Sequence, residues 1–348
     1  MNLIIVSTLT CFFGIVYGFS KSVPVYKLNN GHEMPKVGFG TFLMTPNETD
    51  LAVSSALESG YRHIDAAYIY ENEKDIGHTL KKWFAKGNKR EDIFITTKLP
   101  IMAMRSTDVE KALELSLSNL GLDYIDMYLI HVPFGMKRTE DFQILKYDNE
   151  SFAIDYSTNH FAIWRALEKQ VKAGKVKSIG LSNFNKTQLL RLWNFAEIKP
   201  SNLQIESNVY LQQEELRELC QELKIVMTGY SPLGSGGLIQ MRRKRETVVL
   251  PPLIKHPVVA RLAEVHNKSP GQILLRFGLQ RNIVVIPKST NPKRIKENID
   301  IFNFALTEEE MNKLKSLDQH GKYRKFDFLS LTGIEHHPDY PFPDKFSK

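Results

Sequence analysis

Four side chains that could move a proton lie at or just after the ends of short apolar segments of this sequence. Asp65 ends the segment RHID, and Tyr70 follows it by five residues. Lys98 lies near the end of a second such segment, and His131 ends a third. Because a nearby ammonium group stabilises a phenolate, we expect Lys98 to lower the pKa of Tyr70 below its free value of about 10. Such a phenol can donate a proton near neutral pH, so the pattern predicts an acid for carbonyl reduction.

Each of these residues also has a purely structural interpretation. A single aspartate at the end of a strand is often a cap or an ion-pair partner, and a single histidine is often a hydrogen-bonded core residue. The three segments, however, follow one another along the chain, and their polar residues stand at the same end of each. This arrangement favours one shared proton-handling site over several separate structural roles.

Eight short β-like segments alternate with helical patterns and would have to position that site. They are KVGFG (36–40), RHID (62–65), IFITTKL (93–99), IDMYLIH (125–131), KSIGLS (177–182), LQIES (203–207), KIVMTGY (224–230) and NIVVIPKS (282–289). This alternation and the count of eight predict an α/β fold, a closed (β/α)8 TIM barrel whose strands all end at one face. Two long stretches, 132–158 and 232–255, follow the fourth and seventh strands and are expected as loops at that face. Asn30 and Gly31 predict an N-terminal β-hairpin.

An open dinucleotide-binding sheet is the alternative fold. Its glycine fingerprint is missing from GFGTFLM, because Leu43 stands where the third glycine belongs. No internal repeat or low-complexity linker divides the chain. We therefore expect a single domain over residues 21–348.

The composition of the 348 residues is that of an ordinary globular protein, with 42% hydrophobic and 24% charged residues. The formal net charge is +7, and the basic residues are scattered apart from the run 242–245. We interpret this charge as solvated surface, which disfavours a nucleic-acid partner. The run 242–245 could also cover cofactor phosphates or serve as a cleavage site. No metal site is predicted.

Residues 1–20 contain no charged side chain and are mainly apolar. They predict a secretory signal peptide and a secreted protein without stable membrane association, with an uncleaved N-terminal membrane anchor as the alternative. Cys11 lies in this segment, which leaves Cys220 without a partner for an intramolecular disulfide. Sequons for N-glycosylation begin at Asn47, Asn149, Asn185 and Asn267, a number close to chance.

Several motifs in order along residues 24–348 resemble those of the aldo-keto reductase family. They are GYRHIDAAYIYENEKDIG, FITTKL, DYIDMYLIHVP, GLSNFN, YSPLGS, IPKSTNPKRIKENI and the C-terminal HPDYPFPDKF. Together with the export signal, they are similar to those of the secreted insect reductases of 3-dehydroecdysteroids. The resemblance implies a monomeric enzyme that reduces an aldehyde or ketone with NADPH. The alternative is a cofactor-binding barrel with a regulatory or structural role, as some relatives of this fold are.

The resemblance also implies a role for each of the four residues in the predicted site. Tyr70 would be the general acid, with Lys98 and Asp65 adjusting its pKa. His131 would orient the carbonyl group and stabilise charge on its oxygen. With these residues, Phe42 and Val132 would line the substrate pocket, at positions where many relatives carry larger aromatic side chains. A ketosteroid is the favoured substrate, while small aldehydes and sugars stay open.

The cofactor positions implied by the resemblance are spread over several strand ends. Those beside the nicotinamide are Ser182, Asn183, Gln204 and Tyr230, with Tyr230 stacking on the ring, and further cofactor contacts are Gly40, Thr41 and Asp65. Those around the pyrophosphate are Ser231, Leu233 and Ser235. Those for the 2′-phosphate and adenine are Lys288, Ser289, Thr290, Arg294, Glu297 and Asn298. Two cations at the 2′-phosphate favour NADPH over NADH, since charge-assisted bonds to phosphate are strong.

Overall fold

A computed structural model describes residues 23–146, 152–235 and 250–343 of the chain. Four sequence features lie outside these residues: the N-terminal segment 1–20, Cys11, the sequon at Asn149 and the basic run 242–245. Within the described ranges, no helix is long and apolar enough to span a membrane.

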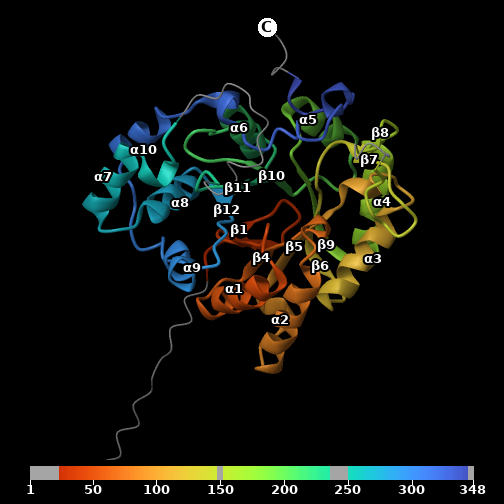
Figure 1. Ribbon diagram of the computed structural model, residues 1–348, viewed down its shortest axis with the longest axis horizontal. Coiled ribbons are helices and arrows are strands. Elements are labelled where there is room, and N and C mark those ends of the chain that lie inside the picture. Colours follow the sequence, from red (N-terminus) through yellow and green to blue (C-terminus); the bar gives the residue numbers. More distant parts are fainter. Residues whose placement is uncertain (1–22, 147–151, 236–249, 344–348) are drawn as a thin grey trace, which may run out of the picture.

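Eight parallel strands form one sheet in the described part of the chain. They are β3 (Phe39–Gly40), β4 (His63–Asp65), β5 (Phe94–Leu99), β6 (Ile125–Ile130), β9 (Val176–Ser182), β10 (Asn202–Glu206), β11 (Val226–Tyr230) and β12 (Ile283–Val285). Neighbours in the sheet follow the order of the chain. The two edges meet through a parallel bridge between Val37 and Val285, where the Gly38 amide donates to the Val285 carbonyl at 2.9 Å. The predicted (β/α)8 barrel is therefore confirmed (Figure 1).

The first and last strands are shorter than their sequence segments suggest. The segment 36–40 is a regular strand only at Phe39–Gly40, and 282–289 only at Ile283–Val285. Pro287 has no amide hydrogen to donate to a ladder. Its carbonyl still accepts a bond from the Gly40 amide at 3.1 Å, so the two edges stay joined beyond the regular strands.

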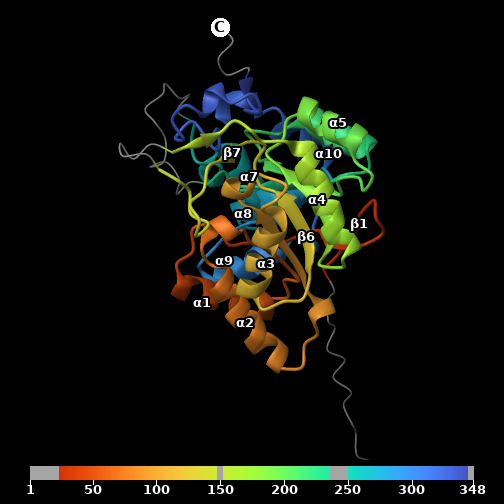
Figure 2. The same ribbon diagram turned by 90° about the vertical axis from the view of Figure 1, so that its right-hand side faces the viewer.

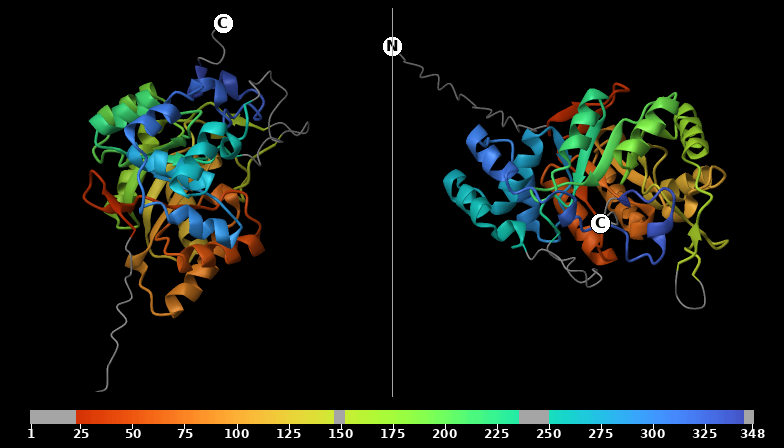
Figure 3. Two further views of the ribbon diagram at one scale, coloured as in Figure 1. Left: turned by 90° about the vertical axis from the view of Figure 1, so that its left-hand side faces the viewer. Right: turned by 90° about the horizontal axis from the view of Figure 1, so that it is seen from above.

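Ten helices of the described ranges surround the sheet (Figures 1 and 3). They are α1 (Pro46–Glu58), α2 (Glu73–Ala85), α3 (Val109–Leu120), α4 (His160–Lys172), α5 (Lys186–Phe195), α6 (Glu214–Glu222), α7 (Pro257–His266), α8 (Pro270–Gln280), α9 (Pro292–Ile299) and α10 (Glu308–Lys315). Capping boxes begin several of them, for example Thr45 with Glu48 at α1 and Ser269 with Gln272 at α8. Their apolar faces pack on the sheet, with Trp164 of α4 fully buried.

A β-hairpin closes the barrel where the strands begin. Its strands β1 (Val25–Lys27) and β2 (Glu33–Pro35) are antiparallel, and Gly31 takes a φ of 91° in the turn. A positive φ is cheap for glycine, so the Asn-Gly signal is confirmed as a turn. Met34 is 0% exposed and packs among residues from the barrel interior.

The opposite end of the barrel is covered by the long loop after β6 and by the C-terminal segment (Figure 2). The stretch 132–158 is not wholly irregular, because β7 (Gly135–Met136) and β8 (Ile154–Asp155) form an antiparallel pair. Apolar side chains of this loop pack against the segment 329–340. Short 3₁₀ helices complete the described chain: η1 (Tyr68–Tyr70), η2 (Arg90–Asp92), η3 (Ile101–Ala103), η5 (Leu253–Lys255), η6 (His320–Tyr323) and η7 (Ile334–His336).

Candidate active site

Lys98, Asp65 and Tyr70 meet at the carboxyl end of β4 and β5. The Lys98 ammonium, fully buried, lies 2.7 Å from a carboxylate oxygen of Asp65 and 2.8 Å from the Ala66 carbonyl. Its third neighbour is the hydroxyl of Tyr70 at 3.4 Å. Tyr70 ends η1, after which Glu71 turns the chain with a φ of 58°. The short turn therefore returns the phenol to the strand ends, so that one ammonium contacts both predicted partners.

The pKa of Tyr70 departs from the expectation. Burial raises the pKa of the phenol above its ordinary value of 10, and the charge of Lys98 offsets only part of this rise. The prediction that the pKa falls below 10 is wrong for this state, because desolvation of a phenolate outweighs one nearby cation. For Lys98, burial lowers the pKa, but Asp65 and Tyr70 more than compensate and the pKa is raised. The phenol and the ammonium are thus both protonated at neutral pH.

His131 follows β6 and faces the phenol. Its ring centroid lies 5.7 Å from that of Tyr70, in an edge-to-face arrangement. Burial, followed by the charge of Lys98, holds the pKa of His131 well below its ordinary value of 6.5. The imidazole is therefore neutral at pH 7, with one ring N–H that can donate a hydrogen bond.

Two predicted amide side chains come from β10 and from the turn after β9. Gln204 donates from Nε2 to the second oxygen of Asp65 at 2.6 Å. Asn183, in the left-handed region with a φ of 64°, donates to the His131 carbonyl at 2.9 Å. It also accepts a bond from the Tyr230 hydroxyl at 2.7 Å. Ser182 is buried, and its hydroxyl oxygen accepts from the Asn183 amide at 3.1 Å. These four predicted nicotinamide contacts therefore share one cluster with Asp65.

Gly40 and Thr41 lie on the other side of Asp65. A Cβ placed on Gly40 would lie 3.0 Å from the Ile286 carbonyl, so the backbone there tolerates little more than glycine. Thr41 is fully buried, and its hydroxyl donates to the Asp65 carbonyl at 2.9 Å. Asn72 donates to the Thr41 carbonyl at 2.8 Å and was not predicted. Thr41 thus anchors the backbone beneath the site.

The loop after β11 begins with two serines in strained backbone. Ser231 and Ser235 have φ values of 52° and 43°, and the Ser235 hydroxyl donates to that of Ser231 at 2.6 Å. Leu233, between them, packs partly buried against the hydrophobic core. Residues 236–249 of the predicted loop 232–255 lie outside the described ranges.

The predicted 2′-phosphate site lies between β12 and α9. Lys288 and Arg294 are exposed, and neither forms an ion pair within the described ranges. Ser289 is buried in the turn, where its hydroxyl accepts from the Asn291 amide at 3.1 Å, and Thr290 beside it is exposed. Two exposed cations, one in the turn before α9 and one in its first turn, suit a phosphate ester, so these residues fit the predicted group.

The two predicted adenine contacts lie further along α9. Glu297 is 3.9 Å from Lys293, and Asn298 is buried. The side-chain oxygen of Asn298 comes within 3.5 Å of a Cβ built on Gly271 in α8. Both residues therefore lie on the helix that follows the cationic turn.

The predicted substrate-pocket residues do not all lie together. Phe42 packs against Tyr70, with ring centroids 4.9 Å apart. Val132 is only 5% exposed and belongs to the apolar cluster under the C-terminal segment. Phe326, which precedes that segment and was not predicted, has its ring centroid 6.1 Å from that of Phe42 and 5.2 Å from that of Tyr230. No short motif marks Phe326, because only the path of the C-terminal segment brings it to the site.

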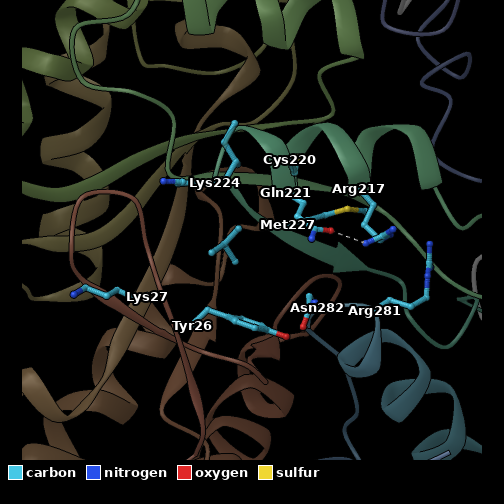
Figure 4. A pocket seen from close by; sticks show the side chains of 11 residues that line it. Tyr26, Lys27, Arg217, Cys220, Gln221, Lys224, Met227, Arg281 and Asn282 are labelled. Atoms are coloured by element: carbon cyan, nitrogen blue, oxygen red, sulfur yellow. Dashed lines mark hydrogen bonds between the residues drawn. The ribbon is translucent and has the colours of Figure 1, made fainter. Parts of the chain in front are cut away.

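A shallow cavity lies at the opposite end of the barrel, where β11 and β12 begin (Figure 4). Arg217 and Arg281, two of the cations around it, both donate to Glu214. The thiol of Cys220, also in its lining, is buried and its pKa is raised to about 12, so it is unreactive at neutral pH. Within the described ranges, no group of three or more potential metal ligands occurs here or elsewhere.

Known proteins align with most of the length of this chain and share its barrel fold. The profile described as "Aldo/keto reductase family" matches residues 36–319. Aldo-keto reductase family 1 member C15 of Rattus norvegicus is 42% identical over 328 residues, which cover 92% of this chain and 97% of the relative. Aldo-keto reductase family 1 member A1 of Cricetulus griseus is 41% identical over 325 residues, with 92% and 98% covered.

Solved structures agree with the sequence comparison. The aldose reductase from Schistosoma japonicum has a TM-score of 0.83 at 40% identity, covering 93% of this chain and 100% of that one. A Bombyx mori aldo-keto reductase in complex with NADP has a TM-score of 0.80 at 35% identity, with 92% and 99% covered. The fold and the site define a (β/α)8 barrel with a polar centre at the carboxyl ends of its strands. The chain belongs to the aldo-keto reductase family.

Proposed function

We propose that this protein reduces an aldehyde or ketone to an alcohol with NADPH, using Tyr70 as the general acid. The observation that carries the proposal is the contact of the buried Lys98 ammonium with both Asp65 and the Tyr70 hydroxyl. A protonated phenol beside a fixed cation can donate its proton and leave a phenolate that the cation stabilises. The raised pKa of Tyr70 supports this direction of transfer, since the proton is present at neutral pH.

The residues divide the chemistry among them. The cofactor, when bound, supplies the hydride that the carbonyl carbon receives. Tyr70 gives its proton to the carbonyl oxygen, so that the C=O group gains one hydride and one proton and becomes an alcohol. Neutral His131 donates a hydrogen bond to the same oxygen and orients it. Asp65 keeps Lys98 in place for the phenolate.

NADPH as cofactor is supported by the residues around α9. Lys288 and Arg294 are both exposed and have no ion-pair partner in the described part of the chain, which suits a 2′-phosphate. Gln204 donates to Asp65 and Tyr230 donates to Asn183, so these side chains offer polar groups that could hold a carboxamide. The Bombyx mori relative, which was solved in complex with NADP, supports the same assignment.

A ketosteroid such as a 3-dehydroecdysteroid is the substrate we propose. Phe42 and Phe326 supply apolar walls beside Tyr70 and Tyr230, as a flat apolar substrate requires. Leu43, the next residue along the chain, is 50% exposed and adds a further apolar side chain next to Phe42. The resemblance of the sequence motifs to those of secreted insect reductases of 3-dehydroecdysteroids supports a steroid over a sugar.

The competing function is a cofactor-binding barrel with a regulatory or structural role. Such a protein has no use for a proton donor, whereas Tyr70, Lys98, Asp65 and His131 form a connected cluster here. The cluster therefore favours the enzyme.

Substitution of Tyr70 by phenylalanine tests the proposal. Y70F retains the ring packing on Phe42 but removes the proton, so we expect kcat to fall by about 10² or more while NADPH still binds. The measurement is NADPH oxidation followed by absorbance against aldehydes, sugars and ketosteroids, with cofactor affinity from fluorescence titration. Unchanged turnover in Y70F would exclude Tyr70 as the acid, and absence of turnover in the wild type would favour the binding protein.

We also propose that residues 1–20 direct export and that residues 21–348 act as a single-domain monomer. The uncharged apolar segment at the N-terminus supports export. Retention of an N-terminal anchor is the alternative. Edman sequencing of the native protein, together with its mass in solution, distinguishes cleaved from anchored and monomer from oligomer.

A further inference from the structure

Glu206 is a buried acid at the active-site end of the barrel that the proposed chemistry does not use. It ends β10 and stands directly opposite Tyr230 of β11 in the parallel register. Its side chain is fully buried, and one carboxylate oxygen accepts the backbone amides of Lys325 and Phe326 at 2.9 and 3.0 Å. A barrel strand end is thus tied directly to the C-terminal segment, about 120 residues later in the chain.

Burial of this acid is costly, and the surrounding groups show what offsets the cost. Burial raises the pKa of Glu206. The hydrogen bond from the Phe326 amide and the charge of Arg324 each lower this pKa, but the net shift is upward. Bonds from N–H groups to a charged oxygen are stronger than those to a neutral one. Gln213 adds to the connection, because its amide donates to the Glu206 carbonyl at 2.9 Å. The buried Glu206 therefore hydrogen-bonds the segment 324–328, which has no regular secondary structure of its own.

The segment that Glu206 holds carries Phe326 into the substrate pocket. The Phe326 ring meets Tyr230 nearly at right angles, with ring centroids 5.2 Å apart, and contacts Phe42 at 6.1 Å. Phe42 in turn packs on Tyr70. The Lys325 ammonium donates to the carbonyls of Gly234 and Ser235, which ties the same segment to the loop after β11. A continuous series of contacts thus leads from Glu206 to the proposed acid.

We propose that Glu206 is a positioning residue that fixes Phe326 as a wall of the carbonyl pocket and so selects flat, apolar carbonyl compounds. This inference rests on the proposed function for its effect on substrate choice. Glu206 itself contacts neither the carbonyl site nor Tyr70. It acts through two backbone bonds, and the discrimination arises where Phe326 contacts the substrate.

The first test does not depend on enzyme activity. Hydrogen exchange followed by mass spectrometry on the peptide containing residues 324–328 compares the wild type with Glu206→Ala and Glu206→Gln. We expect exchange about tenfold or more faster in Glu206→Ala, and an intermediate rate in Glu206→Gln, whose amide oxygen still accepts a bond. Glu215→Gln, at an exposed acid of α6 that pairs with Lys186, is the matched control and should leave the rate unchanged. Equal rates in all four proteins would overturn the proposal.

The second test measures substrate choice with a double-mutant cycle. Glu206→Gln, Phe326→Ala and the double variant are compared for kcat/KM on a ketosteroid and on a small aldehyde. We expect Glu206→Gln to raise KM for the ketosteroid severalfold, to leave kcat for the small aldehyde unchanged, and to add little once Phe326 is alanine. Additive effects, or equal losses on both substrates, would overturn the proposal. Failure of the wild type to turn over any carbonyl would instead refute the proposed function, while the exchange test would still decide the role of Glu206.

Discussion

Two opposing influences set the state of the proposed acid at the scale of single residues. Removal from water raises the pKa of Tyr70, and Lys98 at 3.4 Å lowers it by less. Because the net pKa is raised, Tyr70 is a protonated phenol that can donate its proton, and not a phenolate. Lys98 is most useful after transfer, when the phenolate has formed in a site where water cannot solvate it. Asp65, which bonds both Lys98 and Gln204, connects this proton site to the predicted nicotinamide contacts.

Arg294 provides a residue-scale prediction about cofactor choice. R294A removes one of two cations proposed for the 2′-phosphate, and charge-assisted bonds of this kind contribute about 1.5–3 kcal/mol. We expect KM for NADPH to rise about tenfold or more in steady-state kinetics, with KM for NADH unchanged because NADH lacks that phosphate. Lys296→Ala, at another exposed cation of α9, is the control and should leave both values near the wild type. An equal rise for the two cofactors would contradict the assignment.

At the scale of elements, close contact between α2 and α3 holds the chain that follows Tyr70 in place. Gly77 lies in α2, the helix that begins just after Tyr70, and faces the end of α3. A Cβ built on Gly77 would lie 2.5 Å from the Asn119 carbonyl oxygen and 2.7 Å from that of Leu120. These are backbone atoms, which cannot rotate away as a flexible side chain could. Glycine is therefore required for the approach of α2 to α3.

Substitution of Gly77 by alanine should destabilise the fold. Alanine normally stabilises a helix relative to glycine by roughly 0.5–1 kcal/mol. Here we expect a net loss of about 1–3 kcal/mol, because the added methyl group pushes the two helices apart. Urea denaturation measures the change, with Gly321→Ala as control, since a Cβ there meets nothing within 4 Å. A stabilised G77A would show that α2 and α3 separate at no cost.

Buried histidines make the whole molecule sensitive to acid. His63 lies inside the barrel, where burial lowers its pKa from 6.5 to about 4, and it bonds Thr96 at 3.0 Å. Burial also lowers the pKa of His131 and of His160. An unfolded chain binds protons at these positions below pH 6.5, whereas the folded barrel does not. Protonation therefore favours unfolding, and the stability that neutral histidines confer is present above pH 6.5 and lost as the pH falls below it.

We expect His63 alone to account for a loss of roughly 3 kcal/mol in the free energy of unfolding as the pH falls from 6.5 to about 4. Buried acids with raised pKa, such as Glu73 and Glu206, act in the opposite direction, so a matched variant is needed. H63Q retains a hydrogen-bonding side chain but cannot titrate. Guanidinium denaturation between pH 7.5 and 5 should give a shallower pH dependence for H63Q than for the wild type. Identical slopes would mean that His63 stays neutral in both states.

Much of the site could be predicted from the sequence because of the barrel's regularity. Asp65, Lys98 and His131 stand at or near the ends of apolar segments, and parallel strands must end at one face. Once the segments are recognised as strands, the meeting of these residues follows from the fold class. The hairpin at Asn30 and Gly31 was equally local, since a positive φ depends on the residue itself.

What the sequence by itself determined is the approximate position of the strands and the polar residues Asp65, Lys98 and His131 at or near three of their ends, since both depend on neighbours along the chain. Only the tertiary structure decided the raised pKa of Tyr70, the burial of Val132 under the C-terminal segment and the approach of Phe326 to Tyr230. Each of these depends on groups that are distant in sequence and become neighbours after the barrel closes. Desolvation and packing are properties of everything that surrounds a side chain, so they arise only when the chain has folded.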